Sequence, residues 1–426
     1  MSEPTFHTRR SFLRTSILGG AVAATLPAFI DRTFAALNNA AANSALQVAT
    51  GKDSTILVII QLSGGNDGLN TVIPYSDDAY HRARPNIGFS EKNILRLDDH
   101  TGLSPHLSSF RQLFGEGDAA ILQGVGYPNP NRSHFRSMEI WQTASDSNKT
   151  EPHGWLGRYF DNCCKGADPA TGVSIGDQMP QAFSATTPLG IALKNPRQFR
   201  FAEGADVASD DVEMKSDNEG GSIGALAGNT NSDLGALDYI ERVALDAQVS
   251  SDRIAEIAAR HRDAPVYPRT KLGQDLSLIA QLIAGGMPAR VYYAGMGGFD
   301  THANQNGQHE QLLGQLDDAL AAFVKDLKAQ KNFDRVVVMT FSEFGRRVAE
   351  NGSGGTDHGT AAPMFLVGGG IRPGFVGTAP SLTDLDAGDL KHTVDFRSVY
   401  ATLLEKWLRA PSAKVLGRQF PLLGFV

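Results

Sequence analysis

Acidic and histidine side chains gather in two segments of the C-terminal half of the chain. Asp300 and His302 stand two positions apart in the first segment, and the second runs from Glu343 to Asp357 and His358. Carboxylates that meet at one point repel each other strongly unless a cation neutralises them. Carboxylate and imidazole ligands together suit Zn²⁺, Mn²⁺ or Fe²⁺, and Mg²⁺ or Ca²⁺ also stay open. The sequence therefore predicts a site for one or two divalent metal ions.

A further acidic residue, Asp67, follows the first predicted strand. The segment Ser63–Asn70 contains two consecutive glycines, which let the backbone turn sharply and present Asp67 at the end of the strand. Asn-Asp-Gly is also ordinary turn chemistry, so this carboxylate gains weight as a ligand only together with the later segments. The predicted metal ligands are Asp67, Asp300, His302, Glu343, Asp357 and His358.

The candidate nucleophile is Ser133, which stands where a helix is predicted to begin. The commonest role of a serine at that position is a helix cap. A helix N-terminus also concentrates N–H donors and positive potential, which suits an anion and lowers the pKa of a nucleophile. Arg132 and His134 flank the serine, and we expect them, with Arg346, to contact an anionic substrate.

Five apolar segments must position these side chains. They are rich in β-branched and aliphatic residues, which is typical of buried strands in a parallel sheet. Leucines at helical spacing from Leu312 to Leu327 predict a long helix between the third and fourth strands. Ligands in an open α/β sheet bind at the carboxyl ends of the strands, where the candidate residues follow. The predicted strands are Thr55–Leu62, Ala119–Val125, Arg290–Ala294, Val336–Phe341 and Met364–Val367.

Composition and length exclude some classes of protein. A chain of 426 residues can form one large α/β domain or two smaller ones. Its 41% hydrophobic and 20% charged residues are ordinary for a soluble globular protein. The net charge of −7, without any run of Lys and Arg, argues against a nucleic-acid binder. Cys163 and Cys164 are adjacent and provide no disulfide framework.

The N-terminal segment predicts export. Thr8–Arg14 carries paired arginines and precedes the modestly apolar run Ile17–Ile30, an order typical of a twin-arginine signal peptide. Small residues that follow offer cleavage positions, which assigns residues 1–42 to the signal; the alternative is a basic start to an ordinary helix. No other segment is long and apolar enough to span a bilayer. The mature protein is therefore expected in the periplasm or secreted, with the twin-arginine translocon as its partner during export.

Residues 50–426 are predicted to form one α/β domain with a loop and helical insertion around residues 150–290. The insertion is expected to cover or flank the site. Its middle part is rich in Gly, Ser, Asn and Asp, which favours a solvated loop. The predicted elements of this block are short strands at 172–176 and 189–193, the loop at 204–235 with an acidic stretch at 206–219, and helices at 234–261 and 272–283.

The order of these motifs resembles the alkaline phosphatase superfamily, which includes sulfatases, phosphodiesterases and cofactor-independent phosphoglycerate mutases. More narrowly, residues 50–426 and the export signal are similar to the twin-arginine-exported family called domain of unknown function 1501. The resemblance implies an alkaline-phosphatase-like α/β sandwich, with a mostly parallel central sheet and helices on both faces. The motifs that carry it are Gly64–Asn70, Phe299–His302, Ser342–Arg346 and Asp357–Gly359.

The resemblance also implies roles for individual residues. Asp67 matches the superfamily's first-strand metal aspartate, and Ser133 matches the place of its nucleophile. Asp300 and His302 match ligands before the long helix, although the superfamily usually spaces them further apart. His358 matches the last metal histidine.

Two departures from the superfamily pattern stand out. Glu343-Phe344 occupies the place of an adjacent Asp-His, so one ligand changes type and a histidine is missing; Asp357 would compensate. His392 is a weaker candidate ligand. The Cys-x-Pro-x-Arg signature is absent, which disfavours a formylglycine sulfatase.

The sequence as a whole predicts an exported metal-dependent hydrolase that acts on phosphate or sulfate esters through Ser133. Its substrate would be a small-molecule or polymer-linked anionic ester. One alternative is a binding or scaffold protein that keeps the fold without turnover, which the missing histidine beside Glu343 favours. A third class, an oxidoreductase, is disfavoured because no Gly-x-Gly-x-x-Gly follows a strand.

Overall fold

The computed structural model describes residues 54–164, 169–176, 178–187, 189–193 and 265–426. All of them except Cys163 and Cys164 fall in one compact unit, Ala49–Asn162 with Asp168–Val426. The predicted signal peptide, the acidic stretch at 206–219, the loop at 204–235 and the helix at 234–261 lie outside the described residues.

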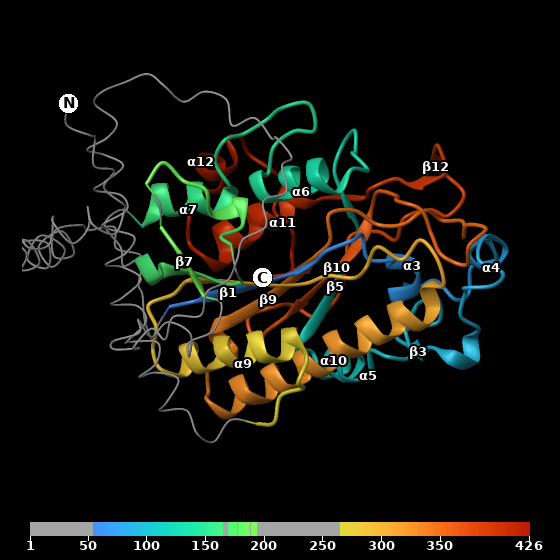
Figure 1. The fold of residues 1–426 in the computed structure, drawn as a ribbon, viewed down its shortest axis with the longest axis horizontal. Helices are drawn as coiled ribbons and strands as arrows, with labels where there is room; N and C mark the ends of the chain where they lie inside the picture. Colours follow the sequence, from blue (N-terminus) through green and yellow to red (C-terminus); the bar gives the residue numbers. More distant parts are fainter. Residues whose placement is uncertain (1–53, 165–168, 177, 188, 194–264) are drawn as a thin grey trace, which may run out of the picture. The chain divides into compact units, whose positions relative to one another are not determined.

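One large sheet organises the described residues. All of its strands run in the same direction except β10, which is antiparallel to both of its neighbours. The predicted mostly parallel sheet is therefore confirmed (Figure 1). The order is β11 (Gly374–Val376), β5 (Ala119–Gly126), β10 (Ala362–Val367), β9 (Val336–Phe341), β1 (Ile56–Leu62), β8 (Val291–Met296), β6 (Gly172–Ile175) and β7 (Ile191–Leu193), and β14 (Val394–Asp395) also pairs with β5.

The strand β1 lies at the centre of this sheet and is nearly completely buried. Leu57 pairs with Val291 of β8 on one side and with Val337 of β9 on the other. Because β1, β5, β8 and β9 run the same way, their carboxyl ends meet at one edge. The reversed β10 begins at that edge, so the segment that joins β9 to β10 lies there too.

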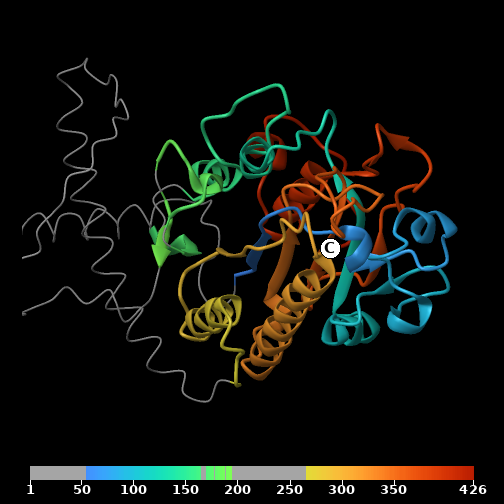
Figure 2. The same cartoon turned by 45° about the vertical axis from the view of Figure 1, so that its right-hand side comes forward.

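Helices cover both faces of the sheet (Figures 1 and 2). On one face α9 (Lys271–Ala284), α10 (Gln305–Ala329) and α5 (Ser108–Glu116) pack through aliphatic side chains. On the other face α6 (His134–Thr143), α7 (Trp155–Cys163) and α11 (Phe396–Thr402) use aromatic rings. Trp141 stacks on Phe341 and on Phe396, with ring centroids 5.3 and 4.3 Å apart.

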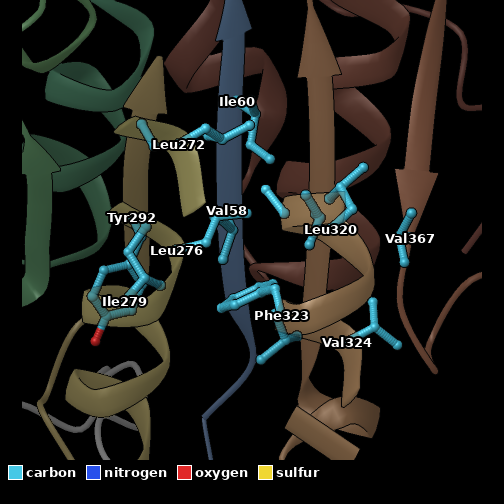
Figure 3. Close-up of a cluster of buried hydrophobic side chains, with 14 of the residues drawn as sticks. Val58, Ile60, Leu272, Leu276, Ile279, Tyr292, Leu320, Phe323, Val324 and Val367 are labelled. Carbon is cyan, nitrogen blue, oxygen red and sulfur yellow. The ribbon is translucent and has the colours of Figure 1, made fainter. Parts of the chain in front are cut away.

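The helix α10 shows how the sequence pattern determines this packing. Leu313, Leu316, Leu320 and Phe323 recur at intervals of three and four residues and are all buried. Figure 3 shows Leu320 and Phe323 close to Val58 of β1. Burying each such side chain contributes about 1.5–3 kcal/mol. This apolar face fixes the helix against the sheet and thereby positions its first turn at the edge where the carboxyl ends of the parallel strands meet. We call this the ligand edge.

Short elements complete the fold. In the predicted insertion, β6 and β7 extend the sheet and α9 covers one face, while residues 194–264 lie outside the description. Among the described helices none combines the length and apolar character that crossing a bilayer requires. The remaining elements are α3 (Gly68–Thr71), β2 (Val72–Ile73), α4 (Asp78–Ala83), η1 (Glu91–Asn93), β3 (Leu95–Arg96), β4 (Gly102–Leu103), η2 (Pro169–Thr171), η3 (Gln181–Phe183), η4 (Phe333–Arg335), β12 (Leu385–Asp386), β13 (Asp389–Leu390), η5 (Leu403–Trp407) and α12 (Ser412–Leu416).

Candidate metal centre

Three side chains from separate strand ends meet at the ligand edge. His134 follows β5, Asp300 follows β8, and His358 precedes β10; their ligand atoms all lie within 4.8 Å of one another. Asp300 Oδ1 lies 3.0 Å from His358 Nε2, and Asp300 Oδ2 lies 3.4 Å from His134 Nε2. His302 joins them, because its Nε2 lies 3.1 Å from Asp300 Oδ1. We call these four residues the His/Asp cluster.

Each imidazole of the His/Asp cluster has an acceptor on its Nδ1 side. Two of the acceptors are carboxylates and the third is a backbone carbonyl. The carbonyl cannot supply a proton, and ionised carboxylates have none to give, so Nδ1–H donates in each pair and the Nε2 atom of each ring faces inward. The pairs are His134 with Glu343 Oε1 at 2.8 Å, His302 with Asp357 Oδ1 at 3.3 Å, and His358 with the Arg132 carbonyl oxygen at 2.9 Å.

The inward-facing ring nitrogens fit a bound cation. The Nε2 atoms of His302 and His358 lie 3.0 Å apart, and both face the carboxylate of Asp300. Two ring nitrogens at that distance need a proton or a metal ion between them. Histidines that ligate a metal commonly donate the other ring N–H to a carboxylate or a carbonyl, as all three do here. The ligand atoms of His134, Asp300 and His358 are close enough together to hold one divalent ion, and His302 lies beside them.

The carboxyl group of Asp300 is held in its ionised form. Its partial burial raises the pKa, but hydrogen bonds from Arg346 and His358 and the Arg346 charge outweigh that effect. The pKa falls to about 2. The carboxylate is thus charged and available as a ligand at any pH at which the protein would work.

Arg346 connects the loops that follow β1 and β8. Its side chain is fully buried. It donates to the carbonyl oxygens of Gly64 and Gly65 after β1 and to that of Phe299 after β8, besides Thr356 O and Asp300 Oδ1. The residue predicted to contact an anionic substrate thus has a hydrogen bond within the protein at each of its three side-chain nitrogens.

Replacing Arg346 by alanine should lower the free energy of unfolding by about 3–5 kcal/mol. The substitution leaves four carbonyl oxygens and the half-exposed Asp300 carboxylate without their donor, and each buried acceptor left unpaired costs about 1–3 kcal/mol. Urea unfolding measures the effect. Arg82→Ala is the control: its side chain is 70% exposed and lies 3.9 Å from the 90% exposed Asp78, so a change below about 1 kcal/mol is expected. Equal losses in both variants would contradict the role of Arg346.

Asp67 lies at the same edge but is committed to the protein interior. Its Oδ2 accepts from Arg84 at 2.6 Å and from Gln305 at 2.5 Å, and its Oδ1 accepts from the N–H of Leu69 at the start of α3. Burial raises the pKa of Asp67, but the charge and hydrogen bond of Arg84, together with His309 and Gln305, outweigh it and the net shift is downward. Asp67 was predicted to be a metal ligand, and in the structure a buried arginine already neutralises its carboxylate.

Gln305 connects Asp67 to the loops that contain Asp300, His302, Asp357 and His358. Its Oε1 accepts from the hydroxyls of Thr301 and Thr356, at 3.1 and 2.6 Å. These threonines adjoin ligand-loop residues on both sides of the cluster. The sequence did not lead us to predict Gln305 and His309 as site residues. A signal existed, because both polar residues follow the spacing of the buried apolar face of α10. For Arg84 the sequence offers no such signal.

Glu343, Asp357 and Phe344 surround the His/Asp cluster. Glu343 Oε1 accepts from the N–H of Gly64 as well as from His134, and Asp357 Oδ1 also accepts from Asn351. These two expected ligands therefore orient histidines in this structure. Phe344 packs on His134 and His358, with ring centroids 4.9 and 4.5 Å apart. It forms an apolar wall where the superfamily pattern has a histidine.

A glycine makes room for that wall. Gly65 has φ +78°, a conformation that favours glycine, and an added Cβ would lie 2.4 Å from the ring of Phe344. The double glycine after β1 thus serves the approach of the aromatic ring as well as the turn that the sequence predicts.

Ser133 and Arg132 border the His/Asp cluster on the α6 side. Ser133 is the N-cap residue of α6, yet its hydroxyl makes no capping hydrogen bond and is exposed. Arg132 contributes its carbonyl to His358, and its guanidinium donates to Asp389. His134, expected to bind substrate, instead lies within the cluster itself. Sequence spacing could not distinguish these two roles, because the residue immediately follows Ser133.

The buried His309 predicts how stability depends on pH. Burial is the main cause that lowers its pKa, to about 4, and its Nε2 lies 2.9 Å from Asn66 Oδ1. Since the folded-state pKa lies below the usual 6.5, the unfolded chain binds more protons between these values. His309 should therefore cost up to about 3 kcal/mol of stability as the pH falls from 6.5 to 4.

Urea unfolding between pH 7 and 4 measures this effect. His309→Gln keeps an N–H donor for Asn66 but cannot titrate, so its stability should depend less on pH in that window. Identical pH profiles for the variant and the natural protein would contradict the assignment.

A pocket of about 530 Å³ opens beside the cluster. It shares His134 with the His/Asp cluster, includes Glu343, and extends along α6 to Phe135 and Met138. On its other side lie Gly297 and Gly298 after β8. An ester held at the cluster would therefore have space for its alcohol portion.

Comparison with known proteins gives a family and a set of structures. A family model described as "Protein of unknown function (DUF1501)" matches residues 54–424. No curated protein matches the sequence.

Solved structures match over most of the chain at low identity. A protein in the alkaline phosphatase superfamily from Vibrio parahaemolyticus is 10% identical with a TM-score of 0.37, and the match covers 87% of this chain and 70% of that one. The lipoteichoic acid synthase LtaP from Listeria monocytogenes is 11% identical with a TM-score of 0.34, covering 79% and 72%. The C-terminal periplasmic domain of EcEptC from Escherichia coli, solved in complex with Zn, is 9% identical with a TM-score of 0.32, covering 75% and 74%.

Proposed function

The chain belongs to the DUF1501 family, and we propose that it is a metal-dependent hydrolase of phosphate or sulfate esters. The observation that carries the proposal is the His/Asp cluster, in which three imidazole Nε2 atoms face one carboxylate. An acceptor at the Nδ1 atom of each ring holds the ring in this orientation. Histidines held in this way by a second partner are typical of metal ligands, whereas a structural role does not require it.

One divalent ion would be held by His134, Asp300 and His358, with His302 beside them. Nitrogen-rich ligands with one carboxylate suit Zn²⁺, Mn²⁺ or Fe²⁺ better than Mg²⁺ or Ca²⁺. When bound, the ion supplies charge stabilisation for the ester oxygens and activation of the nucleophile. A second ion has weaker support, because Arg84 already neutralises Asp67.

Ser133 is the proposed nucleophile. Its hydroxyl is exposed, makes no capping bond and directly precedes His134. In the first step the Ser133 oxygen bonds to phosphorus or sulfur and its proton passes to solvent, while the bond to the ester oxygen breaks and that oxygen takes a proton from solvent, so that the alcohol leaves. In the second step water cleaves the serine ester and restores the hydroxyl. The N–H groups at the start of α6 and the guanidinium of Arg132 are suited to the non-bridging oxygens.

The twin-arginine segment within residues 1–42 leads us to propose export to the periplasm or the outside, with folding before translocation. This part of the proposal rests on sequence alone and does not affect the chemistry.

A screen of phosphomonoesters, phosphodiesters and sulfate esters tests the proposed activity. Hydrolysis of at least one class should disappear after treatment with a chelator and return when Zn²⁺, Mn²⁺ or Fe²⁺ is added back. Hydrolysis that survives complete metal removal would overturn the metal-dependent mechanism.

A binding or scaffold protein without turnover is the second candidate. The pairing of Asp67 with Arg84 and the presence of Phe344 favour it, because both remove ligands of a second ion. This candidate predicts that the cluster binds metal and that no ester class is hydrolysed.

A further inference from the structure

We propose that the pocket beside the His/Asp cluster binds an uncharged six-membered ring with an apolar face, either aryl or pyranose, as the alcohol portion of the substrate. This inference rests on the proposed ester hydrolysis and adds the class of leaving group to it. One exposed aromatic ring, the lining of the pocket and the charge of that lining support it.

The exposed ring is Phe135, in the first turn of α6. It is 90% exposed, although it lies in a regular helix and adjoins His134 of the cluster. Among the described residues, the other exposed large hydrophobic side chains are Val266, at 96%, and Leu422, at 45%. Neither of these lines the pocket. A phenyl ring kept in water at the mouth of a site offers a flat surface for stacking.

The same face of α6 continues the apolar surface. Met138 and Glu139 stand three and four residues after Phe135, so the three side chains lie on one side of the helix and line the pocket together. Gly297 and Gly298 also line the pocket and offer backbone without side chains, and an added Cβ at Gly297 would contact nothing within 4 Å. A flat ring stacked on Phe135 therefore meets no side chain at these two lining positions.

The charge of the pocket argues against an anionic leaving group. Its lining contains the carboxyl groups of Glu139 and Glu343 and no Lys or Arg among the described residues. Glu139 pairs with Arg136, at 2.7 Å, outside the lining. Glu139 and Gln181 supply polar groups for ring hydroxyls, whereas a further carboxylate or sulfate on the ring would meet like charge.

The catalytic test compares two esters on the metal-loaded protein. Phe135→Ala should lower kcat/KM for phenyl phosphate or phenyl sulfate by roughly tenfold and leave the corresponding ethyl ester nearly unchanged. Val266→Ala is the matched control, because its side chain is 96% exposed outside the pocket, and it should change neither ester. An equal effect of Phe135→Ala on both esters would overturn the ring subsite while the proposed hydrolysis stands.

The binding test needs no turnover. Saturation-transfer NMR with benzyl alcohol and with methyl glucopyranoside should show transfer to at least one ring in the natural protein, and that transfer should fall in Phe135→Ala but not in Val266→Ala. The responding probe identifies the source as aryl or pyranose. Transfer that depends on Phe135 in a protein without ester hydrolysis would support the subsite and reject the proposed function. Absence of transfer from both rings would overturn the subsite.

Discussion

Replacing Asp300 by alanine should remove both metal binding and ester hydrolysis. The carboxylate lies within 3.4 Å of all three imidazoles of the His/Asp cluster and is the one anionic group among those four residues. Losing a direct ligand should weaken metal affinity by more than about 100-fold, the upper end for residues that only support ligands. Hydrolysis measured at limiting metal concentration should fall at least as far.

Two further variants make this result interpretable. Asp78→Ala removes a 90% exposed carboxylate that pairs weakly with Arg82, and it should change neither metal affinity nor turnover. Glu343→Gln keeps an acceptor for His134 and Gly64 and should weaken the metal by no more than about 10- to 100-fold. Unchanged metal affinity in Asp300→Ala would show that these residues do not form the metal centre.

Replacing Ser133 by alanine should lower kcat at least about 10³-fold, because it removes the atom that forms the covalent intermediate. Metal content should stay unchanged, since the hydroxyl is not among the proposed ligands. Stability should change by less than about 0.5 kcal/mol, because the side chain makes no capping hydrogen bond. Steady-state kinetics together with elemental analysis separates these quantities.

Ser90→Ala is a matched control for this experiment. Ser90 is also an exposed residue that precedes a short helix without a side-chain cap, and it should have no effect on kcat. Full activity in Ser133→Ala would reject the nucleophile assignment.

Much of this architecture follows from the sequence because burial imposes a simple pattern. The β1 strand is a nearly unbroken aliphatic run, as a strand covered on both faces must be. The apolar stripe of α10 repeats at helical spacing for the same reason. Once the strands and the crossover helix are identified, the edge at which the strands end can be predicted. Asp300, His302 and His358 are then expected to lie close together at that edge.

The partners of individual carboxylates could not be predicted in that way. Asp67 and Asp300 both follow central strands and both pair with a buried arginine, yet three imidazoles of the His/Asp cluster surround Asp300 alone. Arg84 reaches Asp67 from a separate helix, α4, and its C-cap position carries no sequence signal. Arg346 appeared suited to an anion because arginine often is, whereas only the structure reveals the carbonyl oxygens that occupy it. Local sequence determines secondary structure, but contacts over hundreds of residues decide which charge is neutralised.

Elemental analysis of the purified protein tests whether the His/Asp cluster binds one metal ion. The protein is first loaded with Zn²⁺, Mn²⁺ or Fe²⁺, and excess metal is then removed. The geometry of three inward-facing imidazoles around one carboxylate predicts one equivalent of metal per chain, lost in Asp300→Ala and retained in Asp78→Ala. A folded protein that retains no metal, or that retains two equivalents, would contradict a single His/Asp metal centre.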